Sequence, residues 1–260
     1  MSLVAEEIRV AYGRREAVRG VGLVALAGHV TAIVGPNGSG KSTFLGALTG
    51  SLPFRGTVIL NGRDIATLKP WQQAAERAVL PQATHLAFPF TVIEVVRLGL
   101  QSGIAGARSD VPMRALARVG LAHHAGRSFQ DLSGGEAQRV MLARVLAQVW
   151  EPVAEGRPRW LLLDEPVSSL DIAHQVQVME IARSFARAGG GVVAVMHDLN
   201  LTALHADRIL VLCEGRRLAF GAPSEVLTSD ILSRAYGCNL GVSVPPPPGV
   251  PYVLPHAASL

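Results

Sequence analysis

The residues best suited to chemistry stand in a glycine-rich stretch that ends in a lysine and a serine. This stretch, GPNGSGKS, follows the pattern GxxxxGK[ST], in which backbone N–H groups face phosphates because glycines leave them unobstructed. Lys41 is expected on the β- and γ-phosphates of a nucleotide, and Ser42 on Mg²⁺. The pattern therefore predicts a site for ATP or GTP formed by Gly35, Pro36, Asn37, Gly38, Ser39, Gly40, Lys41, Ser42 and Thr43.

Two adjacent acids form a second candidate site. The apolar run 160–163 predicts a buried strand that carries Asp164 and Glu165 at its carboxyl end. In open parallel sheets, ligands bind at that end of the strands. Asp164 is expected to hold Mg²⁺ through a water molecule, and Glu165 to take a proton from the attacking water. Since adjacent residues of an extended chain point in different directions, we expect the two acids to serve different roles.

A third stretch, 132–136, reads LSGGE and immediately precedes a helical pattern. With this pentapeptide the sequence resembles the ATPase subunits of ABC transporters, whose signature is LSGGQ or a near variant. The resemblance implies that Ser133, Gly134 and Gly135 contact ATP held by the phosphate loop of a second copy, at a helix N-terminus suited to anions. It therefore implies a catalytic homodimer that uses ATP and Mg²⁺.

Four further positions match the same family. Tyr12 stands where an aromatic ring stacks on adenine, although an ordinary strand tyrosine is the alternative interpretation. Gln82, in LPQ, resembles the glutamine that reaches Mg²⁺ and the attacking water and links the site to a helical block. Asp171, in SLD, resembles a residue of the loop at the dimer interface, and His197 resembles the histidine that contacts the γ-phosphate. The resemblance thus implies Glu165, His197 and Gln82 as catalytic residues.

Strand-like and helical patterns alternate along the chain, which predicts an α/β fold with a mainly parallel sheet. Helical spacing over 91–146 interrupts this alternation. With the resemblance, these patterns predict a P-loop NTPase with a mainly parallel sheet core, an N-terminal antiparallel β subdomain and an inserted α-helical subdomain at about 84–148. The domain is expected to span 1–243, before a proline-rich tail at 244–260. The expected strands are 2–12, 21–26, 30–34, 57–60, 79–80, 160–163, 192–196 and 209–212, and the expected helices include 41–48 and 172–187.

Composition narrows the functional class. Hydrophobic residues make up 49% of the 260 residues and charged residues 17%, so a membrane span has to be considered. The charge-free stretch 20–40 is long enough, but Gly28 breaks it and turn residues end it, which favours two buried strands. No signal-peptide pattern is visible, so we expect the chain in the cytosol. The net charge of +4 reflects scattered arginines, which do not indicate a nucleic-acid partner, and Cys213 and Cys238 are expected to be reduced thiols.

Within the family, the sequence resembles the ATPases of haem (hemin) importers, a group related to iron-siderophore and cobalamin importers. The similarity rests on the segments 150–160, 166–175 and 195–203 and on VLPHAA from Val253. It implies ATP hydrolysis that energises hemin uptake, with an inner-membrane permease dimer and a periplasmic substrate-binding protein as partners. It also implies a peripheral location on the cytoplasmic face of the inner membrane. Ferric siderophore and cobalamin are alternative cargoes, and a soluble ABC ATPase acting on ribosomes or DNA, or a regulatory ATP-binding module, are alternatives of other classes.

Overall fold

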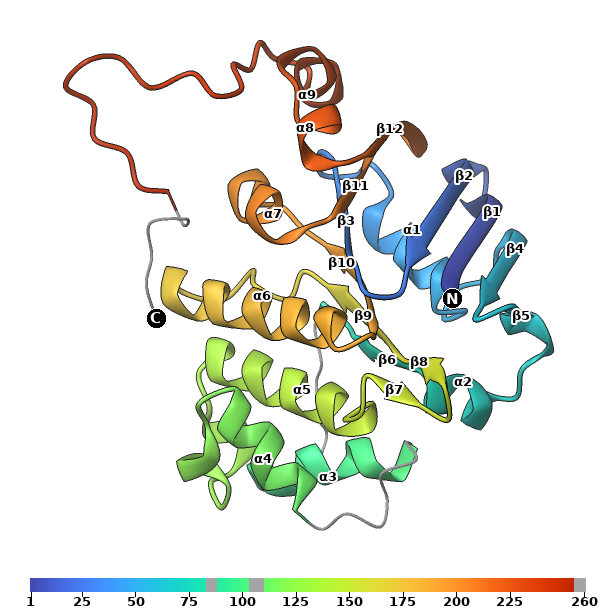
Figure 1. The fold of residues 1–260 in the computed structure, drawn as a ribbon, viewed down its shortest axis with the longest axis vertical. Coiled ribbons are helices and arrows are strands. Elements are labelled where there is room, and N and C mark those ends of the chain that lie inside the picture. The colour runs from blue at the N-terminus through green and yellow to red at the C-terminus, as the bar shows by residue number, and fades with distance from the viewer. Residues whose placement is uncertain (83–87, 103–109, 255–260) are drawn as a thin grey trace.

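The structure is a computed structural model that describes residues 1–82, 88–102 and 110–254, and a six-stranded sheet crosses its centre (Figure 1). The strand order is β12-β11-β3-β10-β9-β6, and all neighbours are parallel except β11 and β12. The prediction of a mainly parallel α/β core is therefore confirmed. The strands are β3 (Val30–Val34), β6 (Arg77–Leu80), β9 (Trp160–Asp164), β10 (Gly191–Val195), β11 (Arg208–Cys213) and β12 (Arg216–Gly221).

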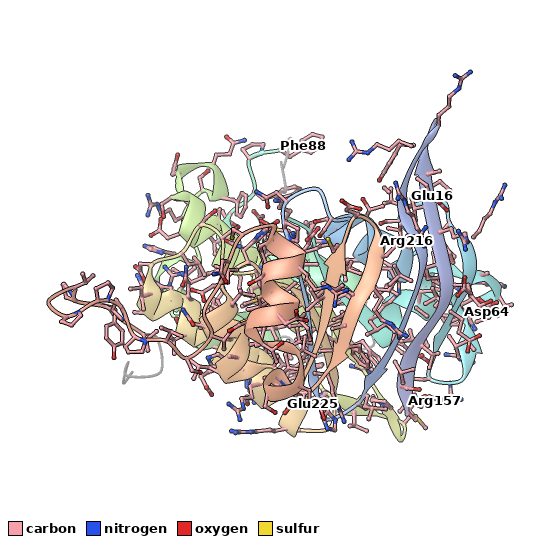
Figure 2. The ribbon with its side chains drawn as sticks, turned by 90° about the horizontal axis from the view of Figure 1, so that it is seen from above. Glu16, Asp64, Phe88, Arg157, Arg216 and Glu225 are labelled. Atoms are coloured by element: carbon pink, nitrogen blue, oxygen red, sulfur yellow. The ribbon has the colours of Figure 1, made fainter. Side chains whose placement is uncertain are left out.

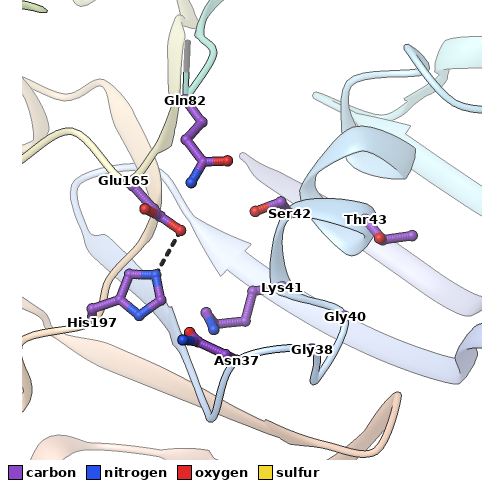
Figure 3. Close-up of a pocket in the computed structure, with 9 residues that line it drawn as sticks. All are labelled: Asn37, Gly38, Gly40, Lys41, Ser42, Thr43, Gln82, Glu165 and His197. Carbon is purple, nitrogen blue, oxygen red and sulfur yellow. Dashed lines mark hydrogen bonds and ion pairs between the residues drawn. The ribbon is translucent and has the colours of Figure 1, made fainter. Parts of the chain in front are cut away.

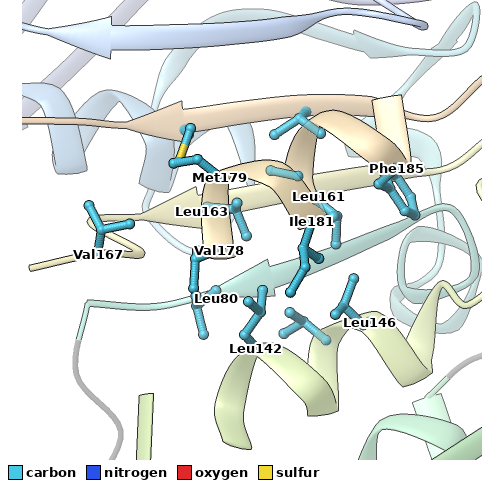
Figure 4. Close-up of a cluster of buried hydrophobic side chains, with 14 of the residues drawn as sticks. Leu80, Leu142, Leu146, Leu161, Leu163, Val167, Val178, Met179, Ile181 and Phe185 are labelled. Atoms are coloured by element: carbon cyan, nitrogen blue, oxygen red, sulfur yellow. The ribbon is translucent and has the colours of Figure 1, made fainter. Parts of the chain in front are cut away.

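Both faces of this sheet are covered, which explains why its central strands consist mainly of apolar residues. β3 and β10 are buried along their whole length, as expected of a parallel sheet between two layers. Leu161 and Leu163 of β9 belong to one hydrophobic cluster and Leu162 to the other, because alternate side chains point to opposite faces. The first cluster includes α5 (Gly134–Gln148) and α6 (Ile172–Arg187), whose side chains meet β6 and β9 in Figure 4. The second includes α1 (Lys41–Leu48) and an antiparallel sheet.

The antiparallel sheet, with the order β2-β1-β4-β5, forms the predicted N-terminal β subdomain. Its long β1–β2 hairpin, which carries the labelled Glu16, runs along one side of the molecule in Figure 2. The charge-free stretch 20–40 is divided between β2 and β3, which lie in different sheets, so the interpretation as two buried strands is confirmed. The bounds are β1 (Ser2–Tyr12), β2 (Arg15–Leu26), β4 (Arg55–Leu60) and β5 (Arg63–Asp64).

None of the helices in the described parts of the chain is long and apolar enough to cross a membrane. The chain between β6 and β9 is mostly helical: α3 (Val92–Ser102), α4 (Val111–Arg118) and α5, with two short 3-10 helices at Ala122–His124 and Phe129–Asp131. α3 and α4 pack on α5, which in turn packs on β6. Part of the predicted insertion 84–148, at residues 84–87 and 103–109, lies outside the described residues, and its exact bounds stay a prediction.

Several elements carry no clear sequence pattern and were not predicted. They include β5, the 3-10 helix Ile65–Thr67, α2 (Pro70–Glu76), the hairpin β7 (Val153–Ala154) and β8 (Arg157–Pro158), β12, α7 (Leu199–His205), α8 (Pro223–Val226) and α9 (Ser229–Tyr236). Most are short, so tertiary packing rather than local propensity decides them. The tail contains no helix or strand over residues 244–254, as predicted, and residues 255–260, with most of the VLPHAA stretch, lie outside the described residues.

Candidate nucleotide-binding site

The glycine-rich loop joins β3 to α1, and two of its glycines are required by close backbone contacts. A Cβ atom at Gly35 would lie 2.1 Å from the Leu212 carbonyl oxygen. A Cβ atom at Gly40, whose φ is +99°, would lie 2.6 Å from the Ala17 carbonyl oxygen. The Lys41 Nζ atom bends back over the loop and donates to the carbonyl oxygens of Gly35 (2.9 Å) and Pro36 (3.0 Å). The loop is thereby held open in front of the α1 N-terminus.

A pocket of about 480 Å³ lies in front of this loop. In Figure 3, Gln82, Glu165 and His197 face Lys41 and Ser42 across the pocket. Residues that are far apart in the sequence are therefore brought to one site. The pocket is lined by Asn37, Gly38, Gly40, Lys41, Ser42, Thr43, Gln82, Glu165 and His197.

Three neighbouring strands deliver the polar residues on the far side of the pocket. Gln82 follows β6, Asp164 and Glu165 stand at the end of β9, and His197 follows β10. These strands are adjacent and parallel, in the order β10-β9-β6, so their carboxyl ends meet at one edge. Ligands of parallel sheets bind at this edge. The sheet order therefore explains why the predicted residues gather here.

The carboxylate of Asp164 is tied to the loop. Ser42 Oγ donates to Asp164 Oδ1 at 2.9 Å. Burial raises the pKa of Asp164, and the charge of Glu165 raises it further, while the Ser42 hydrogen bond and the charge of Lys41 act in the opposite direction. Burial lowers the pKa of Lys41, against the attraction of Glu165 and Asp164. The site thus holds Lys41 and Asp164 at a desolvation penalty, which phosphates would relieve for Lys41 and a cation for Asp164.

Glu165 does not continue the strand that carries Asp164. Its φ of +51° lies in the left-handed region, which a non-glycine residue adopts at a penalty of about 1–3 kcal/mol. We expected the two acids to point in different directions because the chain would be extended at both. This explanation is wrong, since the chain is not extended at Glu165. The strand ends at Asp164, and a turn at Glu165 reorients the second side chain. Its carboxylate Oε1 lies 2.6 Å from His197 Nε2.

One hydroxyl of the loop is suited to a phosphate ligand. Ser39 is 2% exposed, and its hydroxyl has no hydrogen-bond partner among the residues that the structure describes. A buried hydroxyl without a partner is unfavourable by about 1–3 kcal/mol. Phosphate oxygens would supply an acceptor, and the oxygen donors of Ser42, Asp164 and Gln82 are of the kind that suits Mg²⁺. The residues present therefore fit a nucleotide with its cation.

Nine predicted site residues do not line this pocket. Four of them belong to the phosphate loop or are bonded to it, namely Gly35, Pro36, Ser39 and Asp164. The other five lie elsewhere. Tyr12 is 54% exposed at the end of β1. Ser133, Gly134 and Gly135 stand at the N-terminus of α5, where Ser133 and Glu136 form a capping box. Asp171 caps α6 by accepting a hydrogen bond from the His174 N–H. The signature residues are expected to meet the ATP of a second copy, so their roles stay a prediction for a single chain.

Gln138 was not predicted from the sequence. It does not line the pocket but contacts the backbone of Glu165. Gln138 Nε2 donates to the Glu165 carbonyl oxygen at 2.9 Å. Its Oε1 accepts from the Ser169 N–H at 3.3 Å. Gln138 precedes the buried residues Leu142 and Val145 at helical spacing, so it lies on the face of α5 that packs inward. A polar residue on an apolar helix face was the signal that could have identified it.

A phosphate loop between a parallel strand and a helix, with acids at the end of the neighbouring strand, defines the class of P-loop ATPases. Within that class, residues 18–168 match the family model described as ABC transporter. Over 259 residues the chain is 62% identical to the Hemin import ATP-binding protein HmuV of Roseobacter denitrificans, covering 100% of this chain and 99% of the relative. It is 60% identical to the same-named protein of Jannaschia sp., covering 98% and 95%.

Solved structures show the same fold. The ATP-bound structure of a bacterial Atm1-family ABC exporter matches with a TM-score of 0.78 and 27% identity, over 94% of this chain and 42% of that one. A nucleotide-free ATP-binding cassette from an ABC transporter matches with a TM-score of 0.76 and 23% identity, over 93% and 100%. The chain belongs to the ABC transporter family, as an ATP-binding, ATP-hydrolysing subunit closely related to the HmuV proteins. The predicted family and fold class are confirmed.

Proposed function

We propose that this chain is the ATPase subunit of a hemin importer. The observation that carries the proposal is full-length identity of 54% to 62% to proteins named as hemin import ATP-binding proteins. The alignment covers the whole of this chain, including the residues before 18 and after 168 that lie outside the match to the family model. Similarity therefore exceeds what ATP binding alone requires, and it favours hemin as the cargo.

The chain's own residues suit each step of ATP hydrolysis. The loop N–H groups and Lys41 bind the phosphates, and Ser42, Asp164 and Gln82 would hold Mg²⁺, which neutralises phosphate charge when bound. Glu165 takes a proton from the attacking water, because its carboxylate faces the pocket. His197, 2.6 Å from that carboxylate, orients it and contacts the γ-phosphate. Tyr12 stacks on the adenine.

The proposed working unit is a homodimer. In each copy, Ser133, Gly134, Gly135 and Asp171 complete the ATP site of the other copy. This arrangement accounts for the exposure of Ser133 and Gly134, which do not line the pocket of their own chain. The dimer acts on an inner-membrane permease dimer, supplied by a periplasmic substrate-binding protein. The chain is then peripheral, on the cytoplasmic face of the inner membrane.

Reconstitution tests the proposal. The ATPase is assembled with its permease in proteoliposomes, and the binding protein is added with hemin, a ferric siderophore or cobalamin. We expect hemin alone to stimulate ATP hydrolysis and to accumulate inside the vesicles, with Glu165→Gln as the inactive control. Stimulation by the siderophore or cobalamin but not by hemin would overturn the cargo while leaving the ATPase role intact. Absence of any ATP hydrolysis would overturn the enzymatic role.

A further inference from the structure

Gln138 joins three parts of the site through one side chain. It stands on α5, the helix whose N-terminus carries the signature residues. Its amide nitrogen donates to the carbonyl oxygen of Glu165 at 2.9 Å, and its amide oxygen accepts from the N–H of Ser169 at 3.3 Å. Both hydrogen-bonding ends of the amide are therefore used, and both fix backbone rather than side chains.

The backbone that Gln138 holds needs support. Glu165 has a φ of +51°, and such a conformation persists only where the surroundings enforce it. The Glu165 N–H donates to the Val195 carbonyl oxygen at 3.2 Å, and Ser168 Oγ donates to the Glu165 carbonyl oxygen at 3.2 Å. Among the described residues, Gln138 makes the shortest of the hydrogen bonds to that carbonyl oxygen, and the others come from Ser168 of the same turn.

The start of α5 is packed tightly on the same turn. A Cβ atom at Gly135 would lie 3.1 Å from the Ser169 carbonyl oxygen and 3.2 Å from Leu170 Cδ2. A larger residue there would require these neighbours to give by a few tenths of an ångström. The α5 N-terminus and the turn 165–170 are therefore in close contact, and Gln138 is the hydrogen-bonded link to Glu165 itself.

We propose that Gln138 is a positioning residue, which fixes the Glu165 peptide so that its carboxylate faces the pocket and ties this orientation to α5. The inference rests on the proposed role of Glu165 in hydrolysis. Gln138 touches neither the pocket nor the reacting atoms, so it acts only through Glu165. Its loss should lower the rate of the chemical step and leave ATP binding largely unchanged.

The same helix offers a matched control. Gln148, at the other end of α5, is 8% exposed, and its Nε2 donates to the carbonyl oxygens of Ala74 (2.8 Å) and Arg77 (2.9 Å). It therefore resembles Gln138 in residue type, helix and bonding, but it does not contact the turn that carries Glu165. Gln148→Met reports the effect of losing amide hydrogen bonds on stability alone.

The experiment measures kcat, KM, ATP affinity and Tm for the full-length ATPase and its variants. Gln138→Met should lower kcat about 10-fold, as loss of one hydrogen bond to the catalytic backbone implies, with ATP affinity changed less than about twofold. Gln138→Glu should lower kcat at least as much, because it keeps the acceptor for Ser169 but places an oxygen against the Glu165 carbonyl. Gln148→Met should lower Tm and retain kcat.

A double-mutant comparison distinguishes an effect of Gln138 on the position of Glu165 from a general loss of stability. In a Glu165→Gln background, Gln138→Met should cause no further decrease in the residual rate, since both changes remove the same contribution. A native kcat in Gln138→Met, an equal loss of kcat in Gln148→Met, or independent losses in the double mutant would overturn the proposal. If Glu165→Gln alone hydrolyses ATP at the native rate, the general-base assignment fails instead, so the two failures are distinguishable.

Discussion

His197 Nε2 and Glu165 Oε1 lie 2.6 Å apart, and this contact joins the ends of two neighbouring parallel strands. β9 ends at Asp164, which pairs in register with Val195 at the end of β10. A histidine two residues beyond Val195 can therefore reach a carboxylate one residue beyond Asp164. Both residues belong to the same chain, so the contact that orients the proposed base does not require a second copy.

Glu165→Gln should separate binding from hydrolysis. The amide keeps the shape of the side chain but cannot take a proton, so we expect kcat to fall by about 10²- to 10⁴-fold. ATP affinity should change little, because the phosphate loop is untouched. Equilibrium binding of a labelled nucleotide and a phosphate-release assay measure the two effects, and substantial hydrolysis by the variant would assign the proton transfer to another group.

Lys41→Ala should weaken ATP binding by about 10- to 100-fold, the usual effect of losing charge-assisted hydrogen bonds to phosphate. The chain offers a matched control, since Lys69 is its only other lysine and its side chain is exposed. Lys69→Ala should bind ATP as the native protein does. Titration calorimetry measures both affinities, and equal ATP affinity in the two variants would contradict the role of Lys41.

Asp164→Asn should stabilise the nucleotide-free protein at neutral pH. Burial raises the pKa of Asp164, so the folded state keeps a proton that the unfolded chain has already released, and this group lowers stability as pH rises. The amide removes that penalty and still accepts the Ser42 hydrogen bond. In thermal unfolding at pH 7, Asp164→Asn should show a higher Tm than the native protein. The difference should vanish below about pH 4, where Asp164 is protonated in both the folded and the unfolded state. A lower Tm at pH 7 would contradict this account.

Glu76 should stabilise the segment 150–160. The side chain of Glu76 is buried, forms ion pairs with Arg63 and Arg157, and accepts a hydrogen bond from Asn61 at 3.2 Å. Glu76→Ala leaves these partly buried donors without their acceptor, so we expect a loss of about 1–3 kcal/mol in the free energy of unfolding. Glu7→Ala removes an exposed pair with Arg9 and should change stability little. Denaturant titration compares the two, and equal effects would show that burial does not decide the contribution.

Much of the site could be predicted because its motifs are contiguous. The glycines of the loop, Lys41 and Ser42 follow one another directly in the sequence, so their pattern can be recognised without knowledge of the fold. The acids were found by the same reasoning, since a buried strand has a predictable end. Short elements such as α2 and the β7–β8 hairpin were not predicted, because too few residues carry a periodic pattern.

The sequence alone determined the phosphate loop, the strand that delivers the acids, and the family, because each of these depends on neighbouring residues. Only the tertiary structure decided which distant side chains meet. The order β10-β9-β6 places Gln82 and His197 on either side of Glu165, and the packing of α5 on the turn 165–170 brings Gln138 to its carbonyl. The tertiary structure also showed that the chain leaves the strand at Glu165, whose own φ lies in the left-handed region. Such contacts depend on sheet order and helix packing, which no local spacing encodes.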